Sequence, residues 1–235
     1  MIKEIAKTDL LSSYYNQLKD VRDEGFIPTR FQGDTGVGAT LEHKLGIESN
    51  SESAPDLEGY ELKAARSGSN AQQTLFSNCK LHHWKMSKRN FILRHGIDKG
   101  DRINAYNAVK IKPNKNGLYY EITENHVVVK SGEDIVLQWT KDEISEKYHN
   151  KFPSCLKVFA DTRGRGANEH FHYNRAYAYK TIDKNRFFEM LKSDEIYIDL
   201  RLWMSKSGEV KDHGTSFRCT HRAFENLFEK TILFE

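Results

Sequence analysis

The spacing of apolar residues changes several times along the chain between a helical and a strand pattern. Near the N-terminus, Leu10, Leu11, Tyr14, Leu18 and Val21 recur at the spacing of one helix face. This predicts a helix over residues 8–24 that stops at Gly25. A second, short helix is predicted over 39–45 and ends at Gly46. A polar, loop-like stretch over 47–56 then leads to a strand predicted over 60–65.

The middle of the chain predicts an antiparallel meander followed by a helix. Three strand-like segments, 118–123, 127–130 and 134–139, are separated by the turn sequences Glu124-Asn125 and Ser131-Gly132. Thr140 and Glu143 then have the spacing of a capping box, which predicts a helix over 141–150.

The last third of the chain mixes strands and helices. It predicts strands over 155–162, 171–182 and 195–203, a helix over 184–192, a short strand near 217–219 and a final helix from about His221. Because the order lacks a regular strand–helix–strand alternation, we expect a mixed α/β fold in which a mixed sheet is flanked by helices.

The composition fits a soluble globular protein that forms one large domain or two closely joined lobes over residues 1–235. No apolar run approaches the roughly 18–20 residues that cross a bilayer. Charges near the N-terminus interrupt the apolar stretch that a signal peptide needs, so we expect a cytoplasmic protein with no membrane partner. The three cysteines, Cys79, Cys155 and Cys219, form no zinc pattern and are expected to be buried free thiols.

Positive charge is concentrated in one part of the chain. The net charge is only +3, but residues 80–115 contain ten Lys and Arg against two Asp, and Trp84, Phe91 and Tyr106 are interleaved with them. Such a stretch is typical of a surface that faces a polyanion, although a solvated basic face without a partner gives the same count.

The chemistry is concentrated around the predicted strand 60–65. Asp56 ends the preceding loop, and Glu61 and Lys63 are two residues apart, so they point to the same face of a strand. Two carboxylates at one edge of a sheet make a hard oxygen site of the kind that Mg²⁺ takes. Lys63 could then position or deprotonate a water, and the backbone carbonyl of Leu62 could be a further ligand. The competing interpretation is an ordinary surface strand.

The glycine-rich segment upstream does not complete a nucleotide-binding loop. Gly33, Gly38 and Thr40 fit part of the phosphate-loop pattern, but position 39 is Ala where the lysine that reaches the phosphates is required. What remains is a glycine turn that starts a helix carrying one acidic residue, Glu42.

Together these segments resemble the MutH-like branch of the PD-(D/E)xK nucleases, and in particular the MvaI/BcnI family of monomeric restriction endonucleases. The motif-level similarity lies in residues 33–76, which hold the glycine turn, Glu42, Pro55-Asp56 and Glu61-Leu62-Lys63. Further stretches are similar to that family in the same order: Gln73–Phe76, Val158–Arg165, Phe171–Tyr173, Ala176-Tyr177 and Ile198–Leu200.

The resemblance implies a restriction-endonuclease-like fold whose two lobes clamp one DNA duplex as a monomer. It implies that Asp56 and Glu61 bind Mg²⁺, that Lys63 is the catalytic lysine, and that Glu42 lies against the metal site or the lysine. The implied products carry 5′-phosphate and 3′-hydroxyl ends. A type II enzyme of this kind implies a cognate DNA methyltransferase in the same system, and the family suggests a CC-x-GG type of site.

Several residues outside the motif are candidates for DNA contact, within the regions 80–115, 162–175 and 205–222. They have donor side chains or a glycine-rich context that suits a groove or a phosphate: Arg66, Ser67, Ser69, Arg163, Arg165, His213 and Arg218. Ser77 and Ser216 stand where one branch of the family carries histidines, so the chain departs from that branch at these two positions.

Two alternatives share part of this pattern. A MutH-like nicking or repair endonuclease would use the same chemistry, and a non-catalytic DNA-binding protein would bind DNA without cutting it. The pair His82-His83 is not expected to form a zinc site, because adjacent histidines rarely share a metal.

Overall fold

The computed structural model describes residues 9–47, 55–69, 72–77, 80–181 and 184–235. The chain divides into two compact units, each built from segments far apart in the sequence. The first unit comprises residues 1–69, 151–181 and 228–235, and the second comprises residues 70–150 and 182–227. Predictions for residues 1–8, for most of the loop 47–56 and for Cys79 lie outside the described residues.

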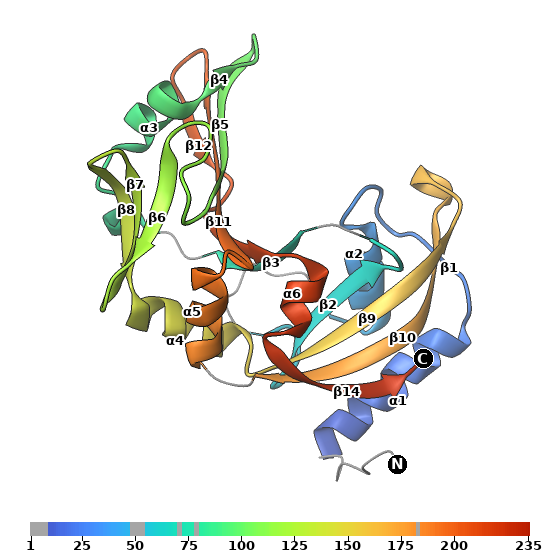
Figure 1. Cartoon of the computed structure of the whole chain (residues 1–235). Helices are drawn as coiled ribbons and strands as arrows, with labels where there is room; N and C mark the ends of the chain where they lie inside the picture. Colours follow the sequence, from blue (N-terminus) through green and yellow to red (C-terminus); the bar gives the residue numbers. More distant parts are fainter. Residues whose placement is uncertain (1–8, 48–54, 70–71, 78–79, 182–183) are drawn as a thin grey trace. The chain divides into compact units, whose positions relative to one another are not determined.

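A five-stranded mixed sheet forms the centre of the first unit (Figure 1). Its strands are β1 (Ile27–Pro28), β2 (Glu61–Arg66), β9 (Ser154–Arg163), β10 (His170–Thr181) and β14 (Phe228–Phe234). The order is β1-β10-β9-β2, and β14 also pairs with β10. Strands β2 and β9 are parallel, and the other pairs are antiparallel. Within the described residues β9 is the only ladder partner of β2, so β2 lies at an open edge.

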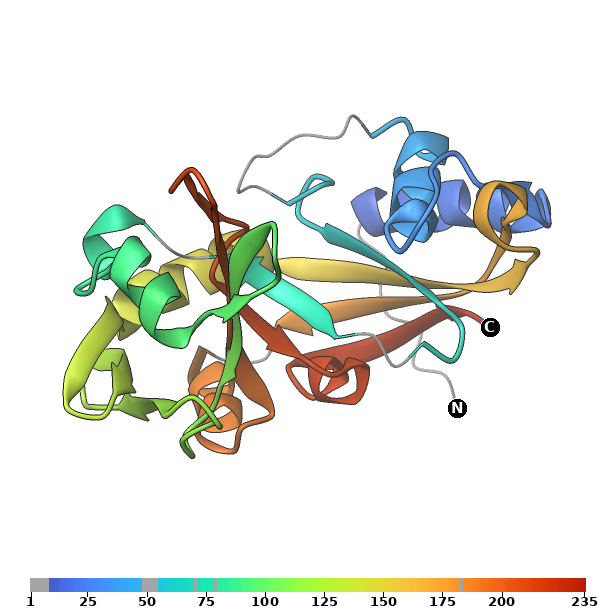
Figure 2. The ribbon, with the colours of Figure 1, turned by 90° about the horizontal axis from the view of Figure 1, so that it is seen from above.

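Two helices, α1 (Asp9–Asp23) and α2 (Gly36–Lys44), cover one face of this sheet (Figure 2). Their apolar residues pack in one cluster with the side chains of Leu62, Leu156 and Phe171. Because successive side chains of a strand point to opposite faces, burying Leu62 against the helices directs Glu61 and Lys63 to the other face.

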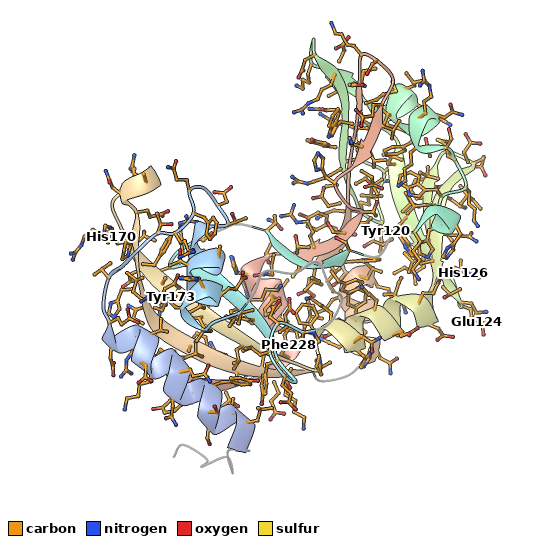
Figure 3. All side chains as sticks on the ribbon, turned by 180° about the vertical axis from the view of Figure 1, so that it is seen from behind. Tyr120, Glu124, His126, His170, Tyr173 and Phe228 are labelled. Atoms are coloured by element: carbon orange, nitrogen blue, oxygen red, sulfur yellow. The ribbon has the colours of Figure 1, made fainter. Side chains whose placement is uncertain are left out.

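Tyr173 fixes the position of α2 on the sheet. Its side chain is fully buried on β10 (Figure 3), and its hydroxyl donates a hydrogen bond to the carbonyl oxygen of Val37 at 2.8 Å. This bond joins the first turn of α2 to the middle of the sheet, and so it helps to place Glu42 one turn further along the helix.

A six-stranded sheet forms the centre of the second unit. Its strands are β3 (Gln73–Ser77), β4 (Ile97–Asp98), β5 (Arg102–Val109), β11 (Ile196–Ser205), β12 (Val210–Asp212) and β13 (Ser216–Cys219). The order is β3-β13-β11-β5-β4, and β12 also pairs with β11. All of these pairs are antiparallel.

The other elements of the chain surround these sheets. The strands β6 (Leu118–Ile122), β7 (His126–Ser131) and β8 (Asp134–Thr140) form a separate antiparallel meander. The remaining helices are α3 (Lys88–His95), α4 (Lys141–Lys151), α5 (Lys184–Lys192) and α6 (His221–Glu225), with two short 3-10 turns, η1 (Leu81–His83) and η2 (Gly166–Asn168). No described helix is long and apolar enough to cross a membrane.

Most elements predicted from periodicity are confirmed, including α1, β2, the meander, α5 and the long strands β9, β10 and β11. The capping box is also confirmed, because Glu143 accepts hydrogen bonds from the backbone and the hydroxyl of Thr140, both at 2.9 Å. The helix predicted over 39–45 begins earlier, at Gly36. Cys155 and Cys219 are buried free thiols, as expected.

The prediction for the C-terminus is wrong in part. The helix that starts at His221 ends at Glu225, and the chain continues as strand β14. Residues Phe228–Phe234 pair with β10, whose residues lie about fifty positions earlier in the chain, so local periodicity did not reveal the strand.

The structure also corrects the prediction for the aromatic residues of the basic stretch 80–115. Trp84 and Phe91 are 9% and 0% exposed, so they belong to the core of the second unit rather than to a surface that faces a polyanion. Tyr106 is exposed, at 45%. The basic residues around Trp84 and Phe91 lie on α3 and its flanks, and the stretch also contains the unpredicted strand β5.

The hydrogen bond of Tyr173 gives a testable prediction. Tyr173→Phe removes the hydroxyl and leaves the carbonyl of Val37 without this donor, so we expect the free energy of unfolding to fall by about 1–2 kcal/mol. Urea denaturation measures the change. The matched control is Tyr60→Phe, since the half-buried Tyr60 makes no hydroxyl hydrogen bond with the described residues. Equal effects of the two variants would contradict the proposed anchoring.

Candidate active site

Strand β2 carries the predicted site residues Glu61, Leu62 and Lys63, and it also positions Asp56. The side-chain oxygen Oδ2 of Asp56 accepts a hydrogen bond from the backbone amide of Leu62 at 3.0 Å. This bond holds the loop residue Asp56 beside the open edge of β2. The Leu62 side chain is 4% exposed and packs in the core.

The same bond shows which way the backbone of Leu62 faces. In an extended strand the N–H and C=O groups of one residue point to the same side. Since the amide of Leu62 points to Asp56 and not to β9, its carbonyl oxygen also points to the open edge. The carboxylate of Asp56 and the carbonyl of Leu62 therefore lie on one side of the strand.

Glu61 is buried and held by two lysines. Its side chain is 1% exposed; Oε1 accepts a hydrogen bond from Lys63, and Oε2 forms an ion pair with Lys151 at 2.8 Å. Burial raises the pKa of Glu61, and the charges and hydrogen bonds of Lys63 and Lys151 oppose that rise. Lys151 was not predicted as a site residue, because nothing in its local sequence links it to a strand ninety positions earlier.

Lys63 is a charged partner of Glu61 in this arrangement. Burial alone would lower the pKa of Lys63, but the charge and the hydrogen bond of Glu61 outweigh it, so the pKa is raised. Lys157, its neighbour in the parallel ladder, is fully buried, and its ammonium group lies 5.1 Å from the ring centroid of Phe159. The face of the sheet that carries Glu61 therefore has a concentration of positive charge.

Glu42 reaches this group of residues from α2. Burial raises the pKa of Glu42, the charge of Asp56 raises it further, and the charge of Lys63 lowers it. A cavity of about 810 Å³ lies between α2 with its preceding turn and strand β2, and its lining includes Arg30, Glu42, His43 and Lys63. The structure thus brings Glu42 close to Asp56 and Lys63.

The donor set fits a hard divalent cation. The carboxylates of Asp56 and Glu61 and the edge-facing carbonyl of Leu62 are the oxygen ligands that Mg²⁺ prefers, and Mg²⁺ commonly keeps several waters beside such groups. The thiol of Cys155 lies near Glu61 and Lys63, but burial raises its pKa to about 12, so it stays protonated at neutral pH and is a poor metal ligand. These residues could therefore hold a magnesium ion.

The predicted phosphate contacts after β2 are already engaged within the protein. Arg66 forms a two-pronged ion pair with Glu169, at 2.7 and 2.8 Å, and also donates to the carbonyl oxygens of Gly33 and Asp34. Ser67 accepts a hydrogen bond from Arg175 at 2.6 Å, and the amide of Ser69 donates to the carbonyl oxygen of Arg66. These contacts tie the glycine turn to β2 and β10.

The predicted arginines of the glycine-rich loop lie in the connection between β9 and β10. Arg163 ends β9, and its guanidinium lies 4.1 Å from the ring centroid of Phe26. Arg165 is exposed and precedes η2. Gly164 has φ +78°, and a Cβ there would lie 2.1 Å from the carbonyl oxygen of Asn168, so the tight turn requires glycine.

The two remaining candidates, His213 and Arg218, belong to the second unit. Arg218 donates to the carboxylate of Asp199 at 2.7 Å, and Arg201 binds the same carboxylate oxygen at 2.7 Å. Asp199 is 5% exposed, so one buried carboxylate orients two arginines. Sequence reasoning missed Asp199 and Arg201, although the alternation of polar with apolar residues along 196–205 was a signal for a polar sheet face.

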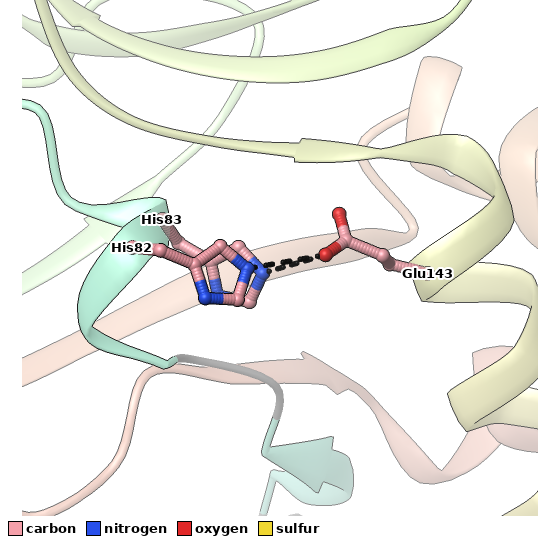
Figure 4. Close-up of side chains that lie close together, drawn as sticks. All are labelled: His82, His83 and Glu143. Atoms are coloured by element: carbon pink, nitrogen blue, oxygen red, sulfur yellow. Dashed lines mark hydrogen bonds and ion pairs between the residues drawn. The ribbon is translucent and has the colours of Figure 1, made fainter.

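A second cluster of possible metal ligands lies in the second unit, where the side chains of His82 and His83 converge on Glu143 (Figure 4). The Nε2 atoms of the two histidines lie 3.3 and 3.2 Å from Oε1 of Glu143. The backbone amide of Lys80 donates to Nδ1 of His83, so the proton of the neutral ring is on Nε2. A metal ion bound at Nε2 of His83 would need a lone pair on that nitrogen, which instead carries the proton. The arrangement therefore favours hydrogen bonds from the histidines to Glu143 over a metal site.

The fold and the edge site together define a class of protein. A mixed sheet flanked by helices, with an Asp and a Glu-x-Lys pair at one open strand edge, is the arrangement of a PD-(D/E)xK nuclease. The family model of the MvaI/BcnI restriction endonuclease family matches residues 15–228. The chain belongs to this family of restriction endonucleases. The resemblance noted from the motifs is thereby confirmed.

Solved structures show the same fold. The chain is similar to the structure titled "Restriction endonuclease MvaI-cognate DNA substrate complex", with a TM-score of 0.81 and 20% identity over 96% of this chain and 99% of that chain. It is also similar to "Restriction endonuclease MvaI in the absence of DNA", with a TM-score of 0.57 and 20% identity over 97% and 99% of the two chains. No curated protein matches the sequence.

The pairing of Glu61 with Lys151 predicts a large effect on stability. Lys151→Met removes one of the two cations that compensate a buried carboxylate, so we expect the free energy of unfolding to fall by about 3 kcal/mol. Chemical denaturation of the metal-free protein measures it. Lys180→Met, at an exposed position of the same unit, should change stability by less than about 0.5 kcal/mol. Similar values for both variants would show that Glu61 does not depend on Lys151.

The raised pKa of Glu42 predicts a pH-dependent gain of stability. An acid whose folded-state pKa is raised destabilises the fold when it is ionised, and this destabilisation disappears as the pH falls below its ordinary value of 4.5. Glu42→Gln in EDTA should therefore raise the melting temperature at neutral pH, with no gain near pH 4. The exposed Glu229→Gln serves as the control. A loss of stability at neutral pH would contradict the assigned environment of Glu42.

Proposed function

We propose that this restriction endonuclease is a type II enzyme that hydrolyses phosphodiester bonds of duplex DNA, with Asp56, Glu61 and Lys63 as its catalytic residues. The observation that carries the proposal is the convergence of Asp56, Glu61, Lys63 and the Leu62 carbonyl at the open edge of β2. The products would carry 5′-phosphate and 3′-hydroxyl ends.

The residues divide the chemical work between them. Asp56, Glu61 and the Leu62 carbonyl would hold Mg²⁺, which when bound supplies charge neutralisation for the phosphate that is attacked. Lys63 is protonated while it is paired with Glu61, so in that state it stabilises negative charge on the phosphate. It can accept a proton from water only after the pairing with Glu61 is broken. Glu42 would orient Lys63 or the hydrated cation from the side of α2.

DNA binding is proposed to involve both units. His213, Arg201 and Arg218 of the second unit, and Arg163 and Arg165 of the β9–β10 loop, present donors suited to base edges and phosphates. Arg66, Ser67 and Ser69 would act by shaping the loop beside β2, given their internal contacts. We further propose a cytoplasmic monomer, a CC-x-GG type of site, and a cognate methyltransferase that protects it.

A digest of phage DNA tests the proposal. The purified protein is incubated with an unmethylated phage genome and Mg²⁺, and an EDTA sample serves as the control. Discrete magnesium-dependent bands are expected, and their mapped ends give the recognition site and the cut position. Nicks confined to hemimethylated sites would instead support a MutH-like enzyme, and binding without any cleavage would contradict the nuclease proposal.

Substitution of the lysine separates chemistry from binding. Lys63→Ala is expected to lower cleavage by at least about 10³-fold, because the phosphate loses its cationic partner, while DNA affinity stays within a few-fold. Cleavage is measured under single-turnover conditions and affinity by gel shift. Lys180→Ala, an exposed lysine of the same unit, should cleave at the wild-type rate. Full activity of Lys63→Ala would refute the assignment.

A further inference from the structure

A hydrogen bond from Trp203 to His213 determines whether the other ring nitrogen of His213 donates or accepts. The indole N–H of Trp203 donates to Nε2 of His213 at 2.6 Å, and the two rings are stacked with an interplanar angle of 30°. The backbone amide of His213 donates to the carbonyl oxygen of Arg201 at 2.9 Å, which holds the residue beside β11. Both contacts lie within the second unit.

The indole group can only donate, so Nε2 of His213 must present its lone pair. The single proton of the neutral ring is therefore on Nδ1. His213 is exposed, and its Nδ1 makes no hydrogen bond with the described residues. Nδ1 is thus a hydrogen-bond donor and not an acceptor.

Trp203 is itself fixed on the polar face of the six-stranded sheet. The guanidinium of Arg102 lies 5.2 Å from its ring centroid, and Arg201 lies two residues before it on the same strand. Side chains two apart on a strand share a face, so Trp203 lies on the face that also carries Asp199 and Arg201. His213 therefore lies beside Trp203 on a face that also carries the guanidinium groups of Arg102 and Arg201.

We propose that Trp203 is a positioning residue that sets the hydrogen-bonding polarity of His213, so that His213 selects a base with an acceptor at the position it contacts in the major groove. Guanine O6 and thymine O4 fit a donor there, and the amino groups of adenine and cytosine at the corresponding positions do not fit. The inference rests on the proposed function of the protein as a DNA-cleaving enzyme.

The tautomer is tested without DNA. Long-range ¹H–¹⁵N NMR of the histidine rings in the intact protein at neutral pH, with His213→Asn to assign the signal, should show His213 protonated on Nδ1 only. Trp203→Phe keeps an aromatic ring but removes the N–H, so the signal should change to a mixture of tautomers. A wild-type ring protonated on Nε2, or a signal unaffected by Trp203→Phe, would overturn the proposal.

The selectivity is tested by binding, in the Lys63→Ala background so that no DNA is cut. The probes are duplexes containing the site selected by this protein from a random oligonucleotide pool, and all their single base-pair variants. Trp203→Phe should lower discrimination by about tenfold at one base pair and leave the other positions unchanged. Thermal melting checks that the variant is folded.

A matched pair of variants tests the polarity directly. His213→Asn places an amide donor near the position of Nδ1 and should retain the preference at that base pair, whereas His213→Asp offers only acceptors and should lose or reverse it. Wild-type discrimination by His213→Asp would overturn the inference. Because the tautomer and the binding preference are measured without cleavage, a failure of the nuclease proposal would be distinguishable from a failure of this one.

Discussion

The arrangement of the first unit depends on keeping the charge of Glu61 inside the protein. An isolated carboxylate that is 1% exposed would be strongly destabilising, so its burial requires close cationic partners. Lys63 supplies one from the same strand, and Lys151 supplies the other from the segment that precedes β9. The parallel pairing of β2 with β9 brings these segments together. The site therefore combines a local motif with a long-range ion pair.

Because β2 lies at the edge of its sheet, backbone groups on one side of the strand are free to face the candidate site. A central strand would use both sides of its backbone for ladder hydrogen bonds, whereas β2 has a ladder partner on one side only among the described residues. Asp56 caps the free amide of Leu62, and the carbonyl of Leu62 remains directed to the same edge. Tyr173 holds α2 on the face of the sheet that buries Leu62, and it thereby helps to position Glu42. The packing of α2 on the sheet thus places Glu42 near Asp56 and Lys63 at the edge of β2.

In the second unit, neighbouring side chains orient several hydrogen-bond donors. Asp199 is buried on the polar face of its sheet and fixes both Arg201 and Arg218, which reduces the freedom of two long side chains. Trp203 does the equivalent for His213 through a single hydrogen bond. A side chain that contacts a base edge is more selective when its orientation and tautomer are fixed before binding. The second unit therefore has several donors that are oriented by neighbouring side chains.

The sequence by itself determined the elements whose signals are local. Helical spacing predicted α1, the capping box predicted the start of α4, and the spacing of Asp56, Glu61 and Lys63 predicted the candidate site. The motifs of residues 33–76 carried the resemblance to the family. Tertiary structure alone decided that the chain ends in strand β14, that Trp84 and Phe91 are core residues, and that Lys151 pairs with Glu61. It also decided that Arg66 is engaged by Glu169 and that Trp203 orients His213. The physical reason is that these features depend on partners that only folding brings within contact distance, while periodicity and spacing report only neighbours along the chain.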